Sequence, residues 1–140
     1  MLGQHGKALQ EAMHRTMADK GIKVAPRGSV FEIEPAETWG RMFAVVAANG
    51  FYETSRQDTK AALEKVLRLC ALKEDVKSVT VTALGTGYGN MEIEDFVEIF
   101  CGLRVPASIE TFELLIHGDI FFKAACRKNE ELGYPATVSA

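Results

Sequence analysis

Strand-like and helix-like segments alternate along this chain of 140 residues, and the alternation limits the folds that it can adopt. Residues 42–47 are apolar throughout, valines alternate with threonines over 79–83, and residues 112–116 form a third, largely apolar run. Helix-like stretches separate the three segments, so successive parallel strands need right-handed crossover connections. The pattern therefore predicts an α/β fold with a mostly parallel, mixed sheet and helices on both faces.

A further strand and further helices complete the predicted order αββαβαβα. Ser55 and Asp58 fit a capping box at the start of one helix, and the closing helix is expected to bury Phe121. The connection between the first two strands allows a hairpin. The elements are expected at about residues 5–20, 29–34, 42–47, 56–73, 79–83, 93–100, 112–116 and 119–132. We expect one domain over residues 1–132 and a poorly ordered tail over residues 133–140.

Composition excludes several classes of protein. Apolar residues make up 47% of the chain and charged residues 25%, with a formal net charge of −3, which is ordinary for one globular domain. The slightly acidic balance provides no basic face for nucleic acid. No apolar run approaches the roughly 18 residues of a membrane span, and the N-terminus has no apolar core of a signal peptide. We therefore expect a soluble, cytoplasmic protein that binds neither nucleic acid nor membrane.

The sequence contains no pattern typical of a disulfide framework, a metal site or a catalytic centre. Cys70, Cys101 and Cys126 are widely spaced among apolar residues of predicted helices, as buried thiols are. The three histidines lack the spacing of metal ligands. No nucleophile is paired with a base in a recognisable way, and no G-x-S-x-G segment is present. We expect no metal, no cofactor and no catalytic residues.

Three alternating glycines, Gly85, Gly87 and Gly89, separate the strand-like residues 79–83 from a helix-like run. Glycine accepts positive φ and has no side chain, so neighbouring backbone N–H groups can converge on a phosphate or carboxylate at a helix N-terminus. The loop also lies at the carboxyl end of a predicted parallel strand, where ligands collect in α/β sheets. The pattern favours an anion site, although the same glycines suit a tight turn equally well.

The loop differs from the common phosphate-binding motifs. It lacks the Lys-Ser/Thr pair of the Walker pattern, and its spacing and position fit a Rossmann fingerprint poorly. Glu92, Glu94 and Asp95 occupy the first turn of the following helix, where they compete with a bound phosphate for the positive helix end. The site is therefore expected to suit a tightly hydrogen-bonded phosphate better than a free polyanion.

Two polar residues at the carboxyl ends of other strands are further candidate ligand contacts. His117 follows the last predicted strand, beside Gly118 and Asp119 and close to where the glycine loop should open. Asn49 follows the strand at 42–47 and can hydrogen-bond a ligand there. The Asn49-Gly50 pair is also a strong turn signal, which is the alternative interpretation.

The segment from Val79 to Met91, VTVTALGTGYGNM, resembles the strand and second phosphate-binding loop of macro domains, whose members bind ADP-ribose and sometimes hydrolyse its derivatives. The N-terminal helix, residues 28–33, residues 43–47 and the last strand follow in the family's order, so the resemblance covers most of the chain. It implies that Tyr88 covers the ribose. The residues that it implies as phosphate contacts, through their backbone amides, are Gly85, Thr86, Gly87, Tyr88, Gly89 and Asn90.

The chain departs from the family in its first part. It begins where the family's third element would be, so the first two strands, the adenine-contacting acidic residue and the N-A-A-N stretch have no counterpart. One of those strands is central in the family's sheet. Either residues 42–47 pair directly with 79–83, or another segment or subunit fills the gap, because each buried unpaired backbone group would cost roughly 1–3 kcal/mol. A homo-oligomer is therefore a further expectation.

Three functions remain open from the sequence. The first is a non-catalytic, macro-like module that binds ADP-ribose or a related phosphate-containing nucleotide through Gly85–Asn90. The second is a degenerate macro-like fold that has lost its ligand and acts as an oligomerising or partner-binding protein. The third is a hydrolase of ADP-ribose adducts, which the absent first-loop motif disfavours.

Overall fold

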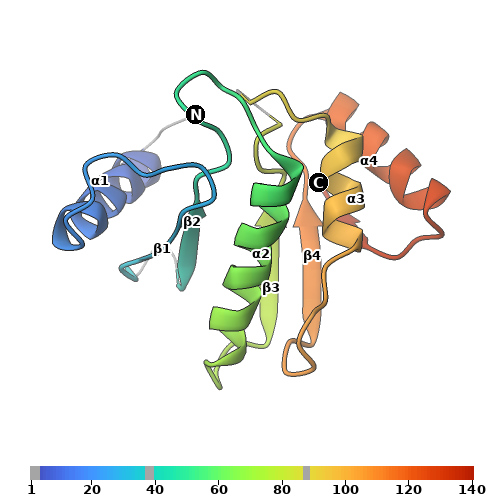
Figure 1. The fold of residues 1–140 in the computed structure, drawn as a ribbon. Helices are drawn as coiled ribbons and strands as arrows, with labels where there is room; N and C mark the ends of the chain where they lie inside the picture. Colours follow the sequence, from blue (N-terminus) through green and yellow to red (C-terminus); the bar gives the residue numbers. More distant parts are fainter. Residues whose placement is uncertain (1–3, 37–39, 87–88) are drawn as a thin grey trace.

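The computed structural model describes residues 4–36, 40–86 and 89–140, which form an α/β fold of four helices and five strands (Figure 1). The helices are α1 (Gln4–Asp19), α2 (Arg56–Ala71), α3 (Ile93–Cys101) and α4 (Asp119–Glu131). The strands are β1 (Val30–Ile33), β2 (Met42–Val45), β3 (Ser78–Thr82), β4 (Thr111–Leu115) and β5 (Thr137–Ser139). All eight predicted elements are confirmed, in the predicted order, and β5 is additional. Across the described ranges, no helix is both long and apolar enough to cross a membrane.

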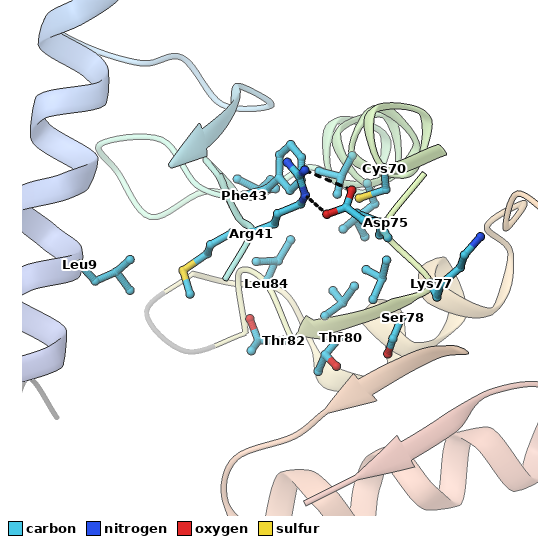
Figure 2. A pocket seen from close by; sticks show the side chains of 17 residues that line it. Leu9, Arg41, Phe43, Cys70, Asp75, Lys77, Ser78, Thr80, Thr82 and Leu84 are labelled. Carbon is cyan, nitrogen blue, oxygen red and sulfur yellow. Dashed lines mark hydrogen bonds and ion pairs between the residues drawn. The ribbon is translucent and has the colours of Figure 1, made fainter. Parts of the chain in front are cut away.

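The five strands form two separate sheets. β1 and β2 pair antiparallel, from Val30 opposite Val45 to Ile33 opposite Met42, as the predicted hairpin requires. β3, β4 and β5 form a parallel sheet with β4 in the centre. Among the described residues no pairing joins β2 to β3, and Figure 2 shows the gap between them. The single mixed sheet expected from the sequence is therefore not formed.

Strand β5 lies in the segment that was expected to be a poorly ordered tail. Residues 137–139 pair in parallel with β4. The side chain of Asn129 in α4, which is 7% exposed, holds the chain just before β5. Its Nδ2 donates to the Ala136 carbonyl oxygen and its Oδ1 accepts from the Ala136 N–H, both at 3.0 Å. The sequence did not predict this strand, because a polar side chain of α4 holds a segment that is too short to show a strand period.

Helices cover one face of the parallel sheet. Val81 and Leu114 lie opposite each other in β3 and β4 and are buried in one apolar cluster with Phe96 of α3. Phe100 stacks on Phe112, with ring centroids 4.4 Å apart and an interplanar angle of 11°. Each fully buried side chain of this size stabilises the fold by roughly 1.5–3 kcal/mol relative to exposure. This cluster is the main core of the protein.

The opposite face of the same sheet is polar. The Thr80 hydroxyl donates to Glu113 Oε1 at 3.2 Å, and the Ser139 hydroxyl donates to Glu113 Oε2 at 3.1 Å. Ser78 and Thr82 are exposed beside them. α1 packs instead against β1 in the other sheet (Figure 1). Within the described residues, the expected helices on both faces of one sheet are therefore not found.

The cysteines are free thiols in helices, as expected. Cys70 is buried, whereas Cys101 and Cys126 are partly exposed. Burial raises the pKa of the Cys70 and Cys101 thiols, which disfavours the reactive thiolate. The prediction of a buried thiol is confirmed fully for Cys70 and in part for the other two.

A buried hydroxyl in α2 yields a stability prediction. Thr59 is 2% exposed, and its Oγ1 has no hydrogen-bond partner within the described part of the chain. An unsatisfied buried polar group costs about 1–3 kcal/mol. We expect Thr59→Val, which keeps the shape and removes the hydroxyl, to stabilise the protein by about 1 kcal/mol and to raise Tm by roughly 3 °C, as measured by thermal unfolding.

Thr16→Val is the matched control, because the buried Thr16 hydroxyl donates to the Ala12 carbonyl oxygen at 2.9 Å. This substitution removes a made hydrogen bond and should not raise Tm. Equal gains for both variants would contradict the explanation.

Candidate functional site

The glycine loop leaves the carboxyl end of β3 and leads into α3. Gly85 has a φ of 75°, in the left-handed region that favours glycine. Its carbonyl oxygen accepts a hydrogen bond from the Met91 N–H at 3.1 Å, and the Thr86 hydroxyl donates to the Ala83 carbonyl oxygen at 2.7 Å. These bonds bring the two ends of the loop together.

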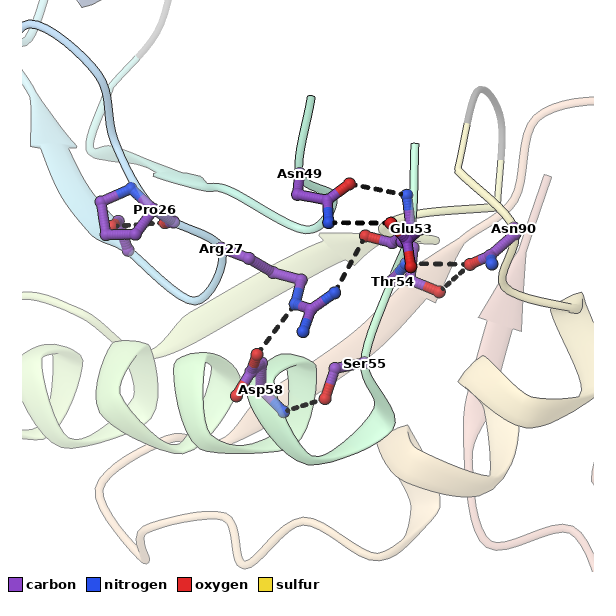
Figure 3. A network of polar contacts seen from close by, with 9 residues as sticks. Pro26, Arg27, Asn49, Glu53, Thr54, Ser55, Asp58 and Asn90 are labelled. Atoms are coloured by element: carbon purple, nitrogen blue, oxygen red, sulfur yellow. Dashed lines mark hydrogen bonds and ion pairs between the residues drawn. The ribbon is translucent and has the colours of Figure 1, made fainter. Parts of the chain in front are cut away.

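The loop packs closely on Thr54, which precedes α2. A Cβ atom added to Gly85 or to Gly89 would lie 2.8 Å from Thr54 Cγ2, and one on Gly89 would also overlap the Gly85 carbonyl oxygen. Asn90 Oδ1 accepts hydrogen bonds from the Thr54 N–H at 2.9 Å and from the Thr54 hydroxyl at 2.5 Å (Figure 3). Glycine is therefore required at two loop positions for close approach, and the Asn90 side-chain oxygen has a structural partner.

The segment that carries Thr54 is itself anchored. Ser55 is the N-cap of α2 and accepts a hydrogen bond from the Asp58 N–H at 3.1 Å, which confirms the N-cap half of the predicted capping box. Arg27 Nε donates to Asp58 Oδ2 at 2.9 Å, and Arg27 Nη1 donates to the Glu53 carbonyl oxygen at 3.3 Å (Figure 3). The segment against which the glycine loop packs is therefore held in place by these hydrogen bonds.

Backbone donors of the loop remain available. At residues 85–86 and 89–90, no backbone N–H donates a hydrogen bond to another described residue. Such groups need a partner, which is water or a ligand where the chain provides none. At its described positions the loop therefore has N–H groups that need water or a ligand as acceptor.

A cavity of about 340 Å³ opens beside the loop. Its lining comes from the loop, the start of α3 and the start of α4, and consists of Thr86, Gly89, Asn90, Met91, Glu92, Ile93, Glu94, Ile120, Phe121 and Ala124. The N-caps of the two helices, Glu92 and Gly118, make no side-chain capping bond. Unpaired N–H groups and partial positive charge therefore border this space. Glu92 and Glu94 add carboxylate acceptors to it.

The structure describes four of the six loop residues predicted to hold a ligand. Those that line the cavity are Thr86, Gly89 and Asn90. Gly85 packs against Thr54, while Gly87 and Tyr88 lie outside the described residues.

The two other predicted ligand residues, Asn49 and His117, do not line the cavity. Asn49 Oδ1 accepts hydrogen bonds from the backbone N–H of Phe51 at 2.9 Å and from that of Glu53 at 3.0 Å, the second of which Figure 3 shows. The side chain of Asn49 therefore closes a turn. His117 is exposed beyond the end of β4. Asn49 thus has the alternative role that the Asn-Gly pair indicates, and ligand contact by either residue stays a prediction.

Sequence reasoning missed the apolar side of the cavity. Ile120 and Phe121, in the first turn of α4, are 81% and 47% exposed. Phe121 was expected on the buried face of the helix, and this expectation is wrong, since the ring is half exposed at the cavity. Two large apolar residues directly after the Gly118-Asp119 turn were the available signal.

A larger cavity, of about 850 Å³, lies in the gap between β2 and β3 (Figure 2). Leu63, Val66 and Cys70 of α2 line it, together with residues of both strands, and Leu9 of α1 reaches it as well. Its lining is therefore mostly apolar, with a strand on either side.

An ion pair closes one end of this gap. Arg41 Nε and Nη2 donate to Asp75 Oδ2 and Oδ1, both at 3.1 Å, and Arg41 Nη1 lies 3.4 Å from Glu32 Oε1. The hydrogen bond from Arg41 holds the pKa of Asp75 below its ordinary value. The pair thus connects the start of β2 to the segment before β3.

No protein-family model matches the chain, and no curated protein matches it significantly. Across the residues that the structure describes, no three histidine, cysteine, aspartate or glutamate side chains are grouped as a metal site.

Gly89→Ala tests the close approach of the loop to Thr54. The added methyl group would overlap the Gly85 carbonyl oxygen, so we expect the variant to lose about 1–3 kcal/mol of stability, measured by urea unfolding. Gly50→Ala is the matched control, because an added Cβ there meets nothing within 4 Å. A stability loss of the same size in the control would refute the packing explanation.

Asp75→Asn tests the ion pair across the gap. Because the folded-state pKa of Asp75 is depressed, its carboxylate stabilises the fold above the unfolded-state pKa of about 3.9, and the contribution is lost as pH falls through the lower folded-state value. We expect the variant's deficit in urea midpoint to be present at about pH 7 and to shrink as pH falls below about 3.9. The control is Glu74→Gln at the exposed neighbour, and a deficit independent of pH would contradict the assignment.

Proposed function

We propose that this chain is a macro-domain-like module that binds ADP-ribose, or a related phosphate-containing nucleotide, in the cavity beside Gly85–Asn90, without catalysing a reaction. The observation that carries the proposal is the set of loop N–H groups without a partner among the described residues, beside a cavity that the starts of two helices border. Such N–H groups and helix ends are favourable for phosphate. The three-layer architecture of macro domains, with one continuous sheet, would need a strand between β2 and β3 that the described residues do not supply.

The remaining lining suits the other parts of a nucleotide. Ile120 and Phe121 offer apolar surface on which a base or the carbon face of a sugar can pack. The carboxylates of Glu92 and Glu94 can accept hydrogen bonds from ribose hydroxyls or from an exocyclic amino group. The cavity is at the small end of the roughly 300–1,000 Å³ of ligand sites, so it would hold a phosphate and one adjoining group of a dinucleotide.

The acidic residues also limit the affinity. Glu92 and Glu94 are both exposed, and their charge opposes the helix-end potential that attracts phosphate. Ionic screening weakens attraction and repulsion alike between exposed charges. We expect the hydrogen bonds of the loop, which are short-ranged, to supply most of the phosphate affinity.

A second candidate function is that of a partner-binding or oligomerising protein without a small ligand. The open edges of β2 and β3 favour it, because unpaired strand edges pair readily with other chains. Sedimentation of the purified protein measures its self-association directly.

Calorimetric titration with ADP-ribose tests the nucleotide proposal. We expect saturable binding with Kd below about 1 mM for the unaltered protein, and at least tenfold weaker binding for Ile120→Glu, whose new charge would face the phosphate. Val24→Glu is the control: Val24 is 86% exposed, Ile120 is 81% exposed, and Val24 lines neither cavity.

Adenosine, which lacks phosphate, should bind much more weakly than ADP-ribose. No saturation by ADP-ribose at millimolar concentration, or equal weakening by the two glutamate variants, would remove the proposal.

A further inference from the structure

Two open strand edges border the gap between β2 and β3 (Figure 2). β2 pairs with β1 and β3 pairs with β4, and among the described residues no strand pairs with the second edge of either. Residues of both strands line the same cavity. An open edge carries a row of unpaired N–H and C=O groups, which is a template for a further strand.

The register shows which backbone groups of β3 point into the gap. The Lys77 carbonyl oxygen accepts a hydrogen bond from the Thr111 N–H at 3.1 Å, so Lys77 bonds towards β4. Alternate residues of a strand bond to the same neighbour. Ser78, Thr80 and Thr82 therefore direct their N–H and C=O groups towards the open edge.

The same argument applies to β2. The Val46 N–H donates to the Ser29 carbonyl oxygen at 2.9 Å, and the Val46 carbonyl oxygen accepts from the Gly28 N–H at 2.8 Å, so Val46 bonds on the side of β1. By alternation, the backbone groups of Phe43 and Val45 face the gap. Donors and acceptors are thus present on both sides of one space.

The two strands run in the same direction. The Arg41–Asp75 ion pair joins the segments at their starts, and beyond their ends an added Cβ on Gly85 would lie 3.6 Å from Ala47 Cβ. The two strands therefore border a slot that the ion pair bounds at one end and the approach of Gly85 to Ala47 bounds at the other. A strand in this slot would join the two sheets into one.

The volume of the slot matches a short strand. A strand residue in a packed sheet occupies about 160 Å³, from a rise of about 3.3 Å, a strand spacing of about 4.8 Å and a layer spacing of about 10 Å. The cavity of about 850 Å³ thus holds about five residues, which is the length of β3. Leu63 and Val66 line it from α2, whereas Ser78 and Thr80 are exposed beside it, so alternate side chains of an occupant meet apolar and polar surroundings.

We infer that the gap between β2 and β3 is a docking site for an extended peptide strand of a partner protein, about five residues long, with apolar side chains at alternate positions. The facing edges of β2 and β3 need an occupant with hydrogen-bond donors and acceptors on both of its sides, spaced at the strand repeat. Only a polypeptide backbone offers this spacing. Because residues of both edges line the same slot, one inserted strand can pair with both of them. The inference is independent of nucleotide binding, which concerns the other cavity.

Hydrogen exchange with a synthetic peptide tests the inference. The probe has the sequence of residues 77–83 with blocked ends, because β3 already shows the required alternation beside the gap. We expect the peptide to slow amide exchange at Ser78, Thr80 and Thr82 at least tenfold, and to leave exchange at Val79 and Val81 unchanged. The control peptide carries N-methyl groups on its two valines and should protect none of these amides.

Two variants at one position provide the matched test in the protein. Thr80→Pro removes an N–H that faces the gap and leaves the β3–β4 bonds in place, as edge strands tolerate. It should weaken peptide binding at least tenfold, whereas Thr80→Val, which keeps the N–H, should bind as the unaltered protein does. The methylated peptide gives the same information if the proline variant fails to fold.

Three results would overturn the inference. The first is that the unmethylated peptide gives no protection at millimolar concentration. The second is that the methylated peptide protects the amides equally well. The third is that protection of the Ser78, Thr80 and Thr82 amides rises with protein concentration when no peptide is present. The last would assign the slot to a second copy of the chain. Loss of ADP-ribose binding would not affect any of these measurements.

Discussion

The apolar stripe of α2 is the interaction on which the rest of this structure depends. In the described part of the chain no strand pairing joins the two sheets, and α2 packs on the β1–β2 hairpin as well as on α3. Leu63, Val66 and Leu67 are each at most 7% exposed. Burial of such side chains contributes roughly 1.5–3 kcal/mol each, whereas an exposed ion pair contributes far less. Packing on α2 therefore holds β2 opposite β3, and polar contacts only adjust their placement.

Those polar contacts decide where the ends of α2 and its neighbours lie. At the N-terminal end of α2, Ser55, Asp58 and Arg27 fix the segment that presents Thr54 to the glycine loop. Beyond its C-terminal end, Asp75 reaches back to Arg41 at the start of β2. The crossover is thus attached at both ends to elements that it does not pair with, which explains how an open slot persists within a folded domain.

Local patterns in the sequence, such as capping residues, apolar periods and glycine spacing, were sufficient to predict helices, strands and loops. The capping box at Ser55 and the apolar period behind it predicted α2, and the glycine spacing placed a loop at the end of β3, where Gly85 and Gly89 meet Thr54. Strand pairing is not encoded in this way, because a period of two residues says which face is buried but not which strand lies alongside. The division into two sheets was therefore beyond sequence reasoning, which left open whether residues 42–47 pair directly with 79–83 or another segment or subunit fills the gap.

The wrong expectations at single residues also arise from contacts that local sequence patterns do not encode. Asn129 holds the last strand through a contact with Ala136, and nothing in its immediate sequence distinguishes it from a solvated asparagine. The apolar period of α4 places Phe121 on the face that was expected to be buried. The start of α4 lies beside the cavity at the glycine loop, however, and leaves the ring half exposed. For Asn49 the turn and the ligand were both open from the sequence, and the hydrogen bonds to Phe51 and Glu53 favour the turn.

The candidate nucleotide site and the slot share β3, and this sets how they can influence each other. The slot contains the open edge of β3, and the chain continues from the end of that strand into Gly85, which contacts both Thr54 and the region of Ala47. A strand docked between β2 and β3 would restrain these segments, and with them the spacing of the loop N–H groups. Coupling between binding sites is reciprocal in free energy, so any effect of a docked strand on nucleotide affinity implies an equal effect of the nucleotide on strand affinity. The physical link between the two sites is thus the short backbone segment from Thr82 to Gly85, rather than any contact between the ligands.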